Sequence, residues 1–323
     1  MEQLIDIVLL GFLVLITIAA IRLRDLFAVV MLFGVYSLLT AALFMDLDAV
    51  DVAFTEAAVG AGVSTVLMLS GLRLTRRWEE VPGHRPLLPL MVVAFTGAAL
   101  IYAMLDAPPL GDPTAPVHQH VTPYYIKQTP LEVGVPNIVT AVLASYRGYD
   151  TFGETVVIFT AGLAVLLLLG VGGGHSFRPG ENAIGDQTVL KPVVKALIPP
   201  ILLYGLYVQF HGDFGAGSGF QAGVIFASGF VLYDLAFGEG NARAVVPPAW
   251  LHRLAALGVL IYGGVGVYAL FAGKAFLDYS ALSSNPVAGQ HTGILLVEVG
   301  VGITVFSVVL SIFYAFSGRR RKS

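Results

Sequence analysis

Apolar residues run along this chain in nine long stretches, separated by shorter polar connections. A helix needs about 20 mostly apolar residues to cross the hydrocarbon core of a bilayer. The stretches that approach or reach this length are 4–21, 26–45, 52–72, 87–105, 152–171, 192–210, 220–237, 254–272 and 293–316. The pattern predicts an all-α, multi-pass integral membrane protein with about nine transmembrane helices. The first stretch has acidic Glu2 and Asp6, no basic residue before it and no small-residue cleavage site, so we expect a retained helix rather than a signal peptide.

The basic residues fall mostly on one side of this predicted arrangement. Of the 18 Lys and Arg, only Lys127, Arg147 and Lys274 lie in connections on the other side. Loops rich in Lys and Arg face the cytoplasm. We therefore predict that the N-terminus lies outside and the C-terminus lies in the cytoplasm.

Composition excludes several classes of function. Hydrophobic residues make up 56% of the 323 positions and charged residues only 12%, where a soluble protein has roughly a quarter charged. The mean hydropathy of +0.81 agrees with a lipid-facing surface. A net charge of −3 leaves no basic excess for nucleic acid. The chain has no cysteine, which excludes disulfides, thiolate metal sites, iron–sulfur clusters and cysteine nucleophiles.

Loop length and composition divide the chain into three blocks. Residues 1–80 hold three closely joined helices and end in the basic string RLTRR. Residues 81–180 hold two helices separated by a long outside loop at 106–151. Residues 181–323 hold four helices and follow the glycine-rich string GVGGG.

Carboxylates within the apolar stretches are the first candidates for chemistry, because a charged side chain in a bilayer costs roughly 2.5–3.5 kcal/mol on insertion scales. Glu56 precedes a run of small residues and lies about 7 Å inside a helix that starts near Asp51. Glu298 lies about 9 Å beyond an expected helix cap at Thr292. Glu56 either belongs to a cation or proton path or is favoured near a helix N-terminus by the helix dipole, whereas Glu298 lies past the first turn, where the dipole no longer explains it.

Glu154 has a simpler expected role. The string TFGE from Thr151 to Glu154 fits a capping box, with Thr151 at the helix cap. We therefore expect Glu56 and Glu298, rather than Glu154, to respond most strongly to replacement by glutamine, although all three are candidates for the ion path.

Further candidates lie on the sixth and seventh apolar stretches. Lys191 and Lys195 are four residues apart on one helix face, and Pro199 and Pro200 follow them and are expected to bend the helix. The lysines either line a half-channel below the bend or extend to the membrane interface. Asp234 lies near the end of its helix, where it is either interfacial or part of the path.

The most distinctive string, HGDFGAGSGFQAG, starts at His211 and holds five glycines in thirteen residues. Its backbone N–H groups are available to an anion or to a partner, and His211 is a candidate for the ion path. His118 and His120 have no third ligand nearby, so we predict no metal site.

Three long strings resemble known membrane modules. DVAFTEAAVGAGVSTVL, from Asp51, resembles the D subunit of membrane-bound hydrogenases, a module that also closes the large A subunit of Mrp-type cation/proton antiporters. VPNIVTAVLASYRGYDTFGE, from Val135, resembles the E subunit of the hydrogenases, and residues 189–316 resemble the B subunit of Mrp antiporters, although the usual PGGGF is AGSGF here. The resemblance implies a π-bulge at Gly60 or Gly62.

The resemblance implies a subunit of a hetero-oligomeric Mrp-type Na⁺/H⁺ antiporter in the cell membrane, with other Mrp subunits as partners and Na⁺ and H⁺ as the transported ions. No cofactor and no nucleic acid are expected. Two alternatives stay open: a membrane-arm subunit of a redox-driven complex, and a non-conducting scaffold. A membrane enzyme is least favoured, because no Ser-His-Asp set, metal cluster or cofactor loop is visible in the sequence.

Overall fold

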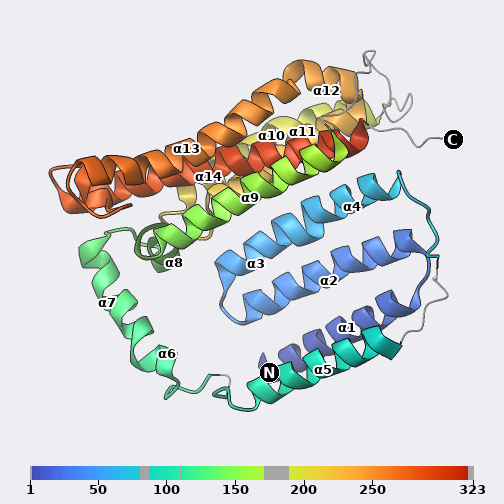
Figure 1. Cartoon of the computed structure of the whole chain (residues 1–323), viewed down its shortest axis with the longest axis horizontal. Helices are drawn as coiled ribbons and strands as arrows, with labels where there is room; N and C mark the ends of the chain where they lie inside the picture. Colours follow the sequence, from blue (N-terminus) through green and yellow to red (C-terminus); the bar gives the residue numbers. More distant parts are fainter. Residues whose placement is uncertain (1, 81–86, 110, 171–188, 319–323) are drawn as a thin grey trace.

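The computed structural model describes residues 2–80, 87–109, 111–170 and 189–318, and this part of the chain is helical throughout its ordered elements (Figure 1). Nine helical segments in it are long and apolar enough to cross a membrane, which confirms the predicted number. The tail after Gly318 and most of the GVGGG string lie outside the described residues.

The first block forms a layer of helices. They are α1 (Glu2–Arg22), α2 (Leu26–Asp46) and a third span made of α3 (Val50–Glu56), η1 (Ala57–Ser64) and α4 (Thr65–Leu72). The middle segment η1 is a π-helix, and it lies where the resemblance implied a π-bulge, with Gly60 and Gly62 inside it. Figure 1 shows α2 between α1 and the third span.

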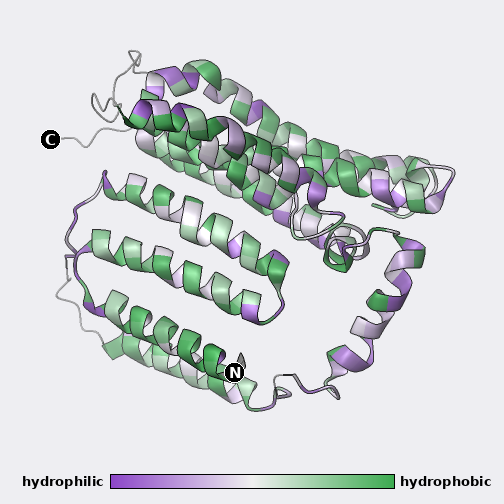
Figure 2. Ribbon diagram, turned by 180° about the vertical axis from the view of Figure 1, so that it is seen from behind, coloured by the Kyte–Doolittle hydropathy of each residue, from purple (hydrophilic) through white to green (hydrophobic). Residues whose placement is uncertain are grey.

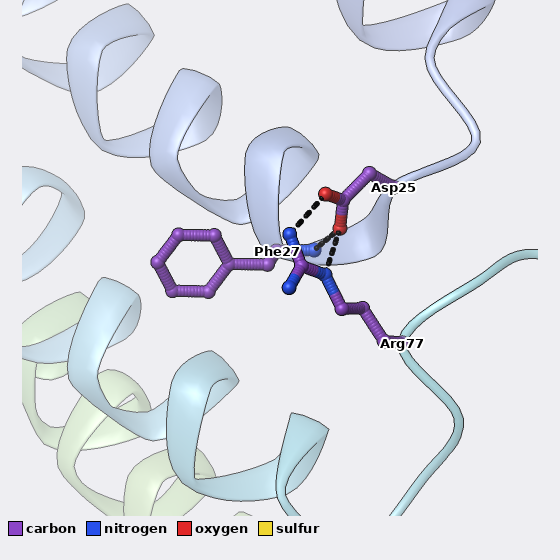
Figure 3. A network of polar contacts seen from close by, with 3 residues as sticks. All are labelled: Asp25, Phe27 and Arg77. Carbon is purple, nitrogen blue, oxygen red and sulfur yellow. Dashed lines mark hydrogen bonds and ion pairs between the residues drawn. The ribbon is translucent and has the colours of Figure 1, made fainter.

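Arg77 ties the end of this layer to the turn between α1 and α2 (Figure 3). Its Nη2 and Nε donate hydrogen bonds to the Asp25 carboxylate at 2.6 and 3.0 Å, and Asp25 also caps α2 by accepting from the Phe27 amide at 3.1 Å. The hydrogen bond from Arg77 lowers the pKa of Asp25. Backbone hydrogen bonds from the Leu26 amide to the Arg77 carbonyl and from the Glu79 amide to the Arg24 carbonyl, both at 2.9 Å, join the same connections, so the ion pair adds to a backbone contact.

The second block starts with one span and continues through short helices. Its elements are α5 (Leu87–Met104), α6 (Pro116–Gln119), α7 (Val121–Glu132), α8 (Ile138–Ala141), the π-helix η2 (Val142–Tyr146) and the span α9 (Gly148–Leu169). In Figure 1 the segment α6–α7 connects α5 to the bundle that contains α9.

The third block is built around its last helix. Its elements are α10 (Leu190–His211), α11 (Gly219–Phe237), α12 (Glu239–Val245), α13 (Pro248–Phe271), the 3₁₀ turn η3 (Tyr279–Leu282) and α14 (Pro286–Ser317). α14 packs against α13, α11 and α9. Helix α10 continues through Pro199 and Pro200 as one helical element.

Burial separates the core helices from those that offer apolar surface. Within the apolar windows of the spans, 56% of α14 and 50% of α11 is buried, against 6% of α1 and none of α5. Figure 2 shows hydrophobic residues along the length of α1 and α5. The core of the described chain thus lies at α11 and α14, and the first block and α5 expose apolar surface to lipid or to other chains.

Small residues allow the central helices to approach closely, as in other membrane bundles. A Cβ added at Gly258 on α13 would collide with Thr304 and with the carbonyl oxygen of Gly300 on α14. A Cβ at Gly219 on α11 would collide with the backbone of α14 at Glu298. These contacts fix the position of the first turn of α11 beside Glu298.

Candidate functional site

A cavity of about 320 Å³ lies where the three blocks meet. Its walls come from α3 in the first block, from α8, η2 and α9 in the second, and from α11 and α14 in the third. Three carboxylate residues line it, Asp51, Glu154 and Glu298, together with hydroxyl and amide side chains. The polar lining residues are Asp51, Thr55, Thr140, Thr151, Glu154, Thr155, Ser218, Gln221 and Glu298.

Glu298 is held at the cavity by the start of α11. The Gly219 amide, in the first turn of α11, donates a hydrogen bond to its carboxylate. A helix N-terminus carries free N–H groups and a partial positive charge, which suits a carboxylate. Asp213 and Asp51 are close enough to act on Glu298 electrostatically. The described neighbours of Glu298 therefore include two more acidic groups.

The depth expected for Glu298 from the sequence was too small. α14 begins at Pro286, with Asn285 as its cap, and the Thr292 hydroxyl donates to the Ala288 carbonyl inside the helix at 2.9 Å. Glu298 is therefore about 18 Å from the helix start at about 1.5 Å per residue. The helix dipole acts mainly on the first turn, so it cannot account for a carboxylate at this position.

The prediction of a capping box at Thr151 is also wrong. α9 begins at Gly148, and the Thr151 hydroxyl donates to the Leu143 carbonyl at 2.7 Å. The chain enters α9 almost directly from η2, so the helix starts earlier than the capping pattern suggests. Glu154 therefore lies within the helix and lines the cavity together with Glu298.

The first and third blocks are joined at this cavity through Gln221. The Gln221 side chain is 4% exposed. Its Nε2 donates to Thr55 Oγ1 at 2.7 Å and to the Asp51 carbonyl at 3.5 Å. Its Oε1 accepts from the Ser218 hydroxyl. The Gly217 amide donates to the Asp51 carboxylate at 3.4 Å.

The second block contacts the same glycine-rich turn. Asn137 Nδ2 donates to the carbonyls of Gly212 and Gly215 at 3.2 and 2.8 Å, and Thr140 Oγ1 donates to Gly212 at 2.6 Å. The three strings singled out by the sequence thus meet at one place.

Several candidates from the sequence lie away from this cavity. The Glu56 carboxylate packs over Gly60 near Ser37 of α2. His211 stacks on Tyr207 with ring centroids 4.7 Å apart. None of these residues lines the cavity. The structure therefore brings Glu298 together with Glu154 and not with Glu56.

The lysine pair and Asp234 lie toward the other end of the bundle. Lys191 is partly buried in the first turn of α10, and the exposed Lys195 places its ammonium 5.7 Å from the centre of the Phe237 ring. Asp234, on α11, is 5% exposed.

Sequence reasoning missed four residues that shape the site. The sequence marks Asp51 as the start of a helix and includes Gln221 in the glycine-rich string, but it assigns neither residue to a site. Asp213 and His291 approach each other with Oδ2 3.5 Å from Nδ1, a polar contact that joins the glycine-rich turn to α14. A polar residue within a run of small residues, such as Gln221, is the sequence signal that identifies a contact site of this kind, because a buried polar group needs a hydrogen-bond partner.

Comparison with known proteins gives the family. A family model described as a domain related to the MnhB subunit of Na⁺/H⁺ antiporters matches residues 189–311. A putative antiporter subunit, mnhB2 of Staphylococcus haemolyticus (strain JCSC1435), is 35% identical over 136 residues, which are 41% of this chain and 96% of that subunit. This chain belongs to the MnhB family of antiporter subunits. Models for the D and E subunits of MBH match residues 11–77 and 85–189, so the chain is an MnhB-type subunit fused to both modules.

The fused arrangement also occurs in a longer relative. The probable K⁺/H⁺ antiporter A/B subunit of Rhizobium meliloti (strain 1021) is 26% identical over 319 residues, which are 88% of this MnhB-type chain. The chain spans only 31% of the length of that relative.

Two solved structures share the fold of this MnhB-type subunit. The Mrp complex from Dietzia sp. DQ12-45-1b contains a chain that is 27% identical, with a TM-score of 0.75, over 98% of this chain and 35% of that one. The membrane-bound sulfane sulfur reductase, an archaeal respiratory membrane complex, has a chain that is 26% identical, with a TM-score of 0.52, over 70% of this chain and 97% of that one. The nine apolar helices and these relatives identify a multi-pass protein of the cell membrane.

Proposed function

We propose that this chain is a component of a multi-subunit Mrp-type antiporter and contributes the cavity between its three blocks to the path of a monovalent cation and protons. The modules in this proposal are residues 1–80, 81–180 and 181–323. The partners of the whole chain would be the other antiporter subunits, which would cover the apolar faces of α1 and α5. The observation that supports the proposal most is the convergence of Asp51, Glu154 and Glu298 on one cavity.

The chemistry of the cavity suits exchange between a proton and a hard cation. Carboxylate, hydroxyl and amide oxygens are the ligands that hard cations such as Na⁺ use in proteins. A carboxylate accepts either a proton or a cation, so occupancy by one excludes the other. The cavity volume of about 320 Å³ also leaves room for several waters at about 30 Å³ each. Relatives are named as both K⁺/H⁺ and Na⁺/H⁺ antiporter proteins, so the proposal names only a monovalent cation.

The direct test replaces each cavity carboxylate by its amide in the assembled complex. We expect Glu298→Gln and Glu154→Gln to reduce cation-dependent proton movement steeply in everted vesicles while the complex still assembles. Glu80→Gln is the matched control, because Glu80 is exposed, lies outside the cavity and forms an ion pair with the exposed Arg76. Glu56→Gln, measured alongside, decides whether the path extends into the first block.

A scaffold role gives the opposite result in the same assay. If the carboxylates only support the fold, the Glu154→Gln, Glu298→Gln double variant keeps full activity per assembled complex. That result would leave a structural subunit as the better description of the chain.

A redox-driven complex is the second candidate, and the match to the sulfane sulfur reductase favours it specifically. Purification of the native complex separates the two candidates through its subunits. Co-purification of iron–sulfur or hydrogenase-like chains would assign this protein to a redox-driven membrane arm.

The proposed orientation has the N-terminus outside and the C-terminus in the cytoplasm. Single cysteines at Ser284 and Ser323 should then be labelled by an impermeant thiol reagent from opposite sides of the membrane, since the natural chain has no cysteine. Labelling of both positions from one side would contradict this topology.

A further inference from the structure

A second group of buried polar side chains lies on the elements that meet at the end of the bundle where α11 and α14 finish, near α12, which joins α11 to α13 (Figure 1). Its members are Asp234 at 5% exposure, Glu239 at 1% and Tyr314 at 3%, with Arg243 beside them. Glu298 and Tyr314 are 16 positions apart on α14, about 24 Å at 1.5 Å per residue. This group is therefore distinct from the cavity.

The hydrogen bonds of the described residues leave both carboxylates under-partnered. Arg243 forms an ion pair with Glu239, donates from Nη2 to the Tyr314 carbonyl at 2.9 Å and lies 5.1 Å from the centre of the Tyr314 ring. Apart from that ion pair, Asp234 Oδ2, both Glu239 carboxylate oxygens and the Tyr314 hydroxyl have no hydrogen-bond partner among the described residues. Asp234 lies close enough to Glu239 and Tyr314 to act on both electrostatically.

Among the residues that the structure describes, the buried charges of the group do not balance. Two buried carboxylates share one largely buried guanidinium, since the Arg243 side chain is 15% exposed. Arg73 at the end of α4 also acts on both carboxylates, but it is exposed. Lys195 on α10 is exposed and directed at the Phe237 ring. Exposed charges of this kind contribute about 1 kcal/mol or less, because water screens them.

A buried excess of one negative charge is costly, and like charges held together in a low dielectric do not both stay ionised. Burial raises the pKa of Glu239 even though Arg243 lies beside it. A single added positive charge would balance the group. Even one Cβ added at Gly318 would collide with Arg243 Nη2 and would crowd the Glu239 carboxylate, so the space beside this pair suits only a small occupant.

We propose that Asp234 and Glu239 form a proton-exchange site at this end of the bundle. One proton binds to a carboxylate oxygen of the pair, and the only bond that forms or breaks is that O–H bond, with water at this end of the chain as donor and acceptor. The site goes beyond the function proposed for the cavity, because it binds its proton whether or not the cavity conducts. In an antiporter it would supply a point of proton entry or release remote from Glu298.

Infrared difference spectroscopy of the purified complex, recorded as the pH is stepped through the neutral range, tests the site directly. The wild-type protein should show a protonated-carboxyl band that is lost as the pH rises. Asp234→Asn should remove this band, and Glu239→Gln should move its midpoint. Asp106→Asn is the control, because Asp106 is exposed and lies outside both polar groups.

Tyr314→Phe provides a test that keeps the packing, since it removes only a hydroxyl and leaves the ring under Arg243. The hydroxyl makes no hydrogen bond to the pair, but its removal leaves a less polar surrounding that disfavours the ionised form, so the midpoint should rise, by up to about one pH unit. Two results would overturn the proposal: an unchanged band in both carboxylate variants, or loss of the band on addition of Na⁺ or K⁺ at constant pH, which would identify a metal-cation site. If the carboxylate variants do not assemble, an unchanged midpoint in Tyr314→Phe overturns it as well.

Discussion

Gly219→Ala tests the contact that places the start of α11 beside Glu298. An ideal Cβ at Gly219 would overlap most closely with the carbonyl oxygen of Glu298, and it would lie 2.9 Å from the carbonyl carbon of Glu298 and 2.9 Å from the amide nitrogen of Gly302. Favourable contacts between carbon atoms begin near 3.5 Å, so the methyl group falls at least about 0.6 Å short of the separation that it needs. The opposing atoms belong to helix backbone, so no change of rotamer relieves the clash. The two helices must move apart.

The cost of this separation has three parts. Overpacking costs about 1–3 kcal/mol, and loss of the hydrogen bond from the Gly219 amide to the Glu298 carboxylate costs about 1.5–3 kcal/mol. Alanine recovers about 1 kcal/mol over glycine in helix propensity. We expect Gly219→Ala to lower the free energy of unfolding by about 1.5–5 kcal/mol and to lower transport, because the carboxylate loses its fixed donor.

Thermal unfolding of the purified complex and cation-dependent proton movement in vesicles measure the two effects. Gly264→Ala is the matched control, since Gly264 lies in α13 with nothing within 4 Å of an added Cβ. It should keep transport and leave stability unchanged or raised by up to about 1 kcal/mol. Wild-type stability and transport in Gly219→Ala would refute the close backbone contact and the role of the amide.

Two further predictions concern the joints between elements. Gln221→Leu should lower the free energy of unfolding by about 1–3 kcal/mol, because it removes the hydrogen bond from the buried Gln221 amide to the Thr55 hydroxyl, which keeps only its own bond to the Asp51 carbonyl. A double-mutant cycle with Thr55→Val that gives simple additivity would contradict this. Arg77 lowers the pKa of Asp25, so the stability from this pair is complete above the unfolded pKa of about 3.9 and is lost as pH falls through the lower folded value. The free energy of unfolding of Arg77→Met should therefore be lower than that of the wild type above pH of about 3.9 and should equal it at a pH below the folded pKa of Asp25. A difference in the free energy of unfolding that persists at the lowest pH would count against the pairing.

The apolar stretches predicted the spans because lipid imposes a length on them that hardly depends on neighbours. Helix starts depended on neighbours and were predicted less well. Thr151 and Thr292 have the side chains of helix caps, yet both lie inside helices and bond to carbonyls of the preceding turn or segment. A capping pattern shows that a residue is able to cap. Whether the helix starts there is decided by the chain before it.

The grouping of carboxylates could not be predicted from single helices. Glu56 and Glu298 are equivalent by sequence, because each precedes small residues on an apolar stretch. In the structure Glu56 faces α2, while Glu298 faces the start of α11 and shares its cavity with Glu154. Such a grouping depends on how three blocks pack, and the sequence of any one helix contains no information about the other two.

The cavity gives a physical reason for the fusion of the three blocks. Its walls are supplied by Asp51 and Thr55 from the first block, Glu154 from the second, and Gln221 and Glu298 from the third. In the Staphylococcus haemolyticus relative, the third block alone accounts for 96% of the protein, so the corresponding walls would have to come from other chains. A covalent link replaces that association with an intramolecular contact at an effective concentration up to about the millimolar range. Hydrogen bonds such as those from Gln221 to Thr55 and from Thr140 to Gly212 then only have to orient blocks that are already linked, whereas separate chains would need larger apolar interfaces to hold the same geometry.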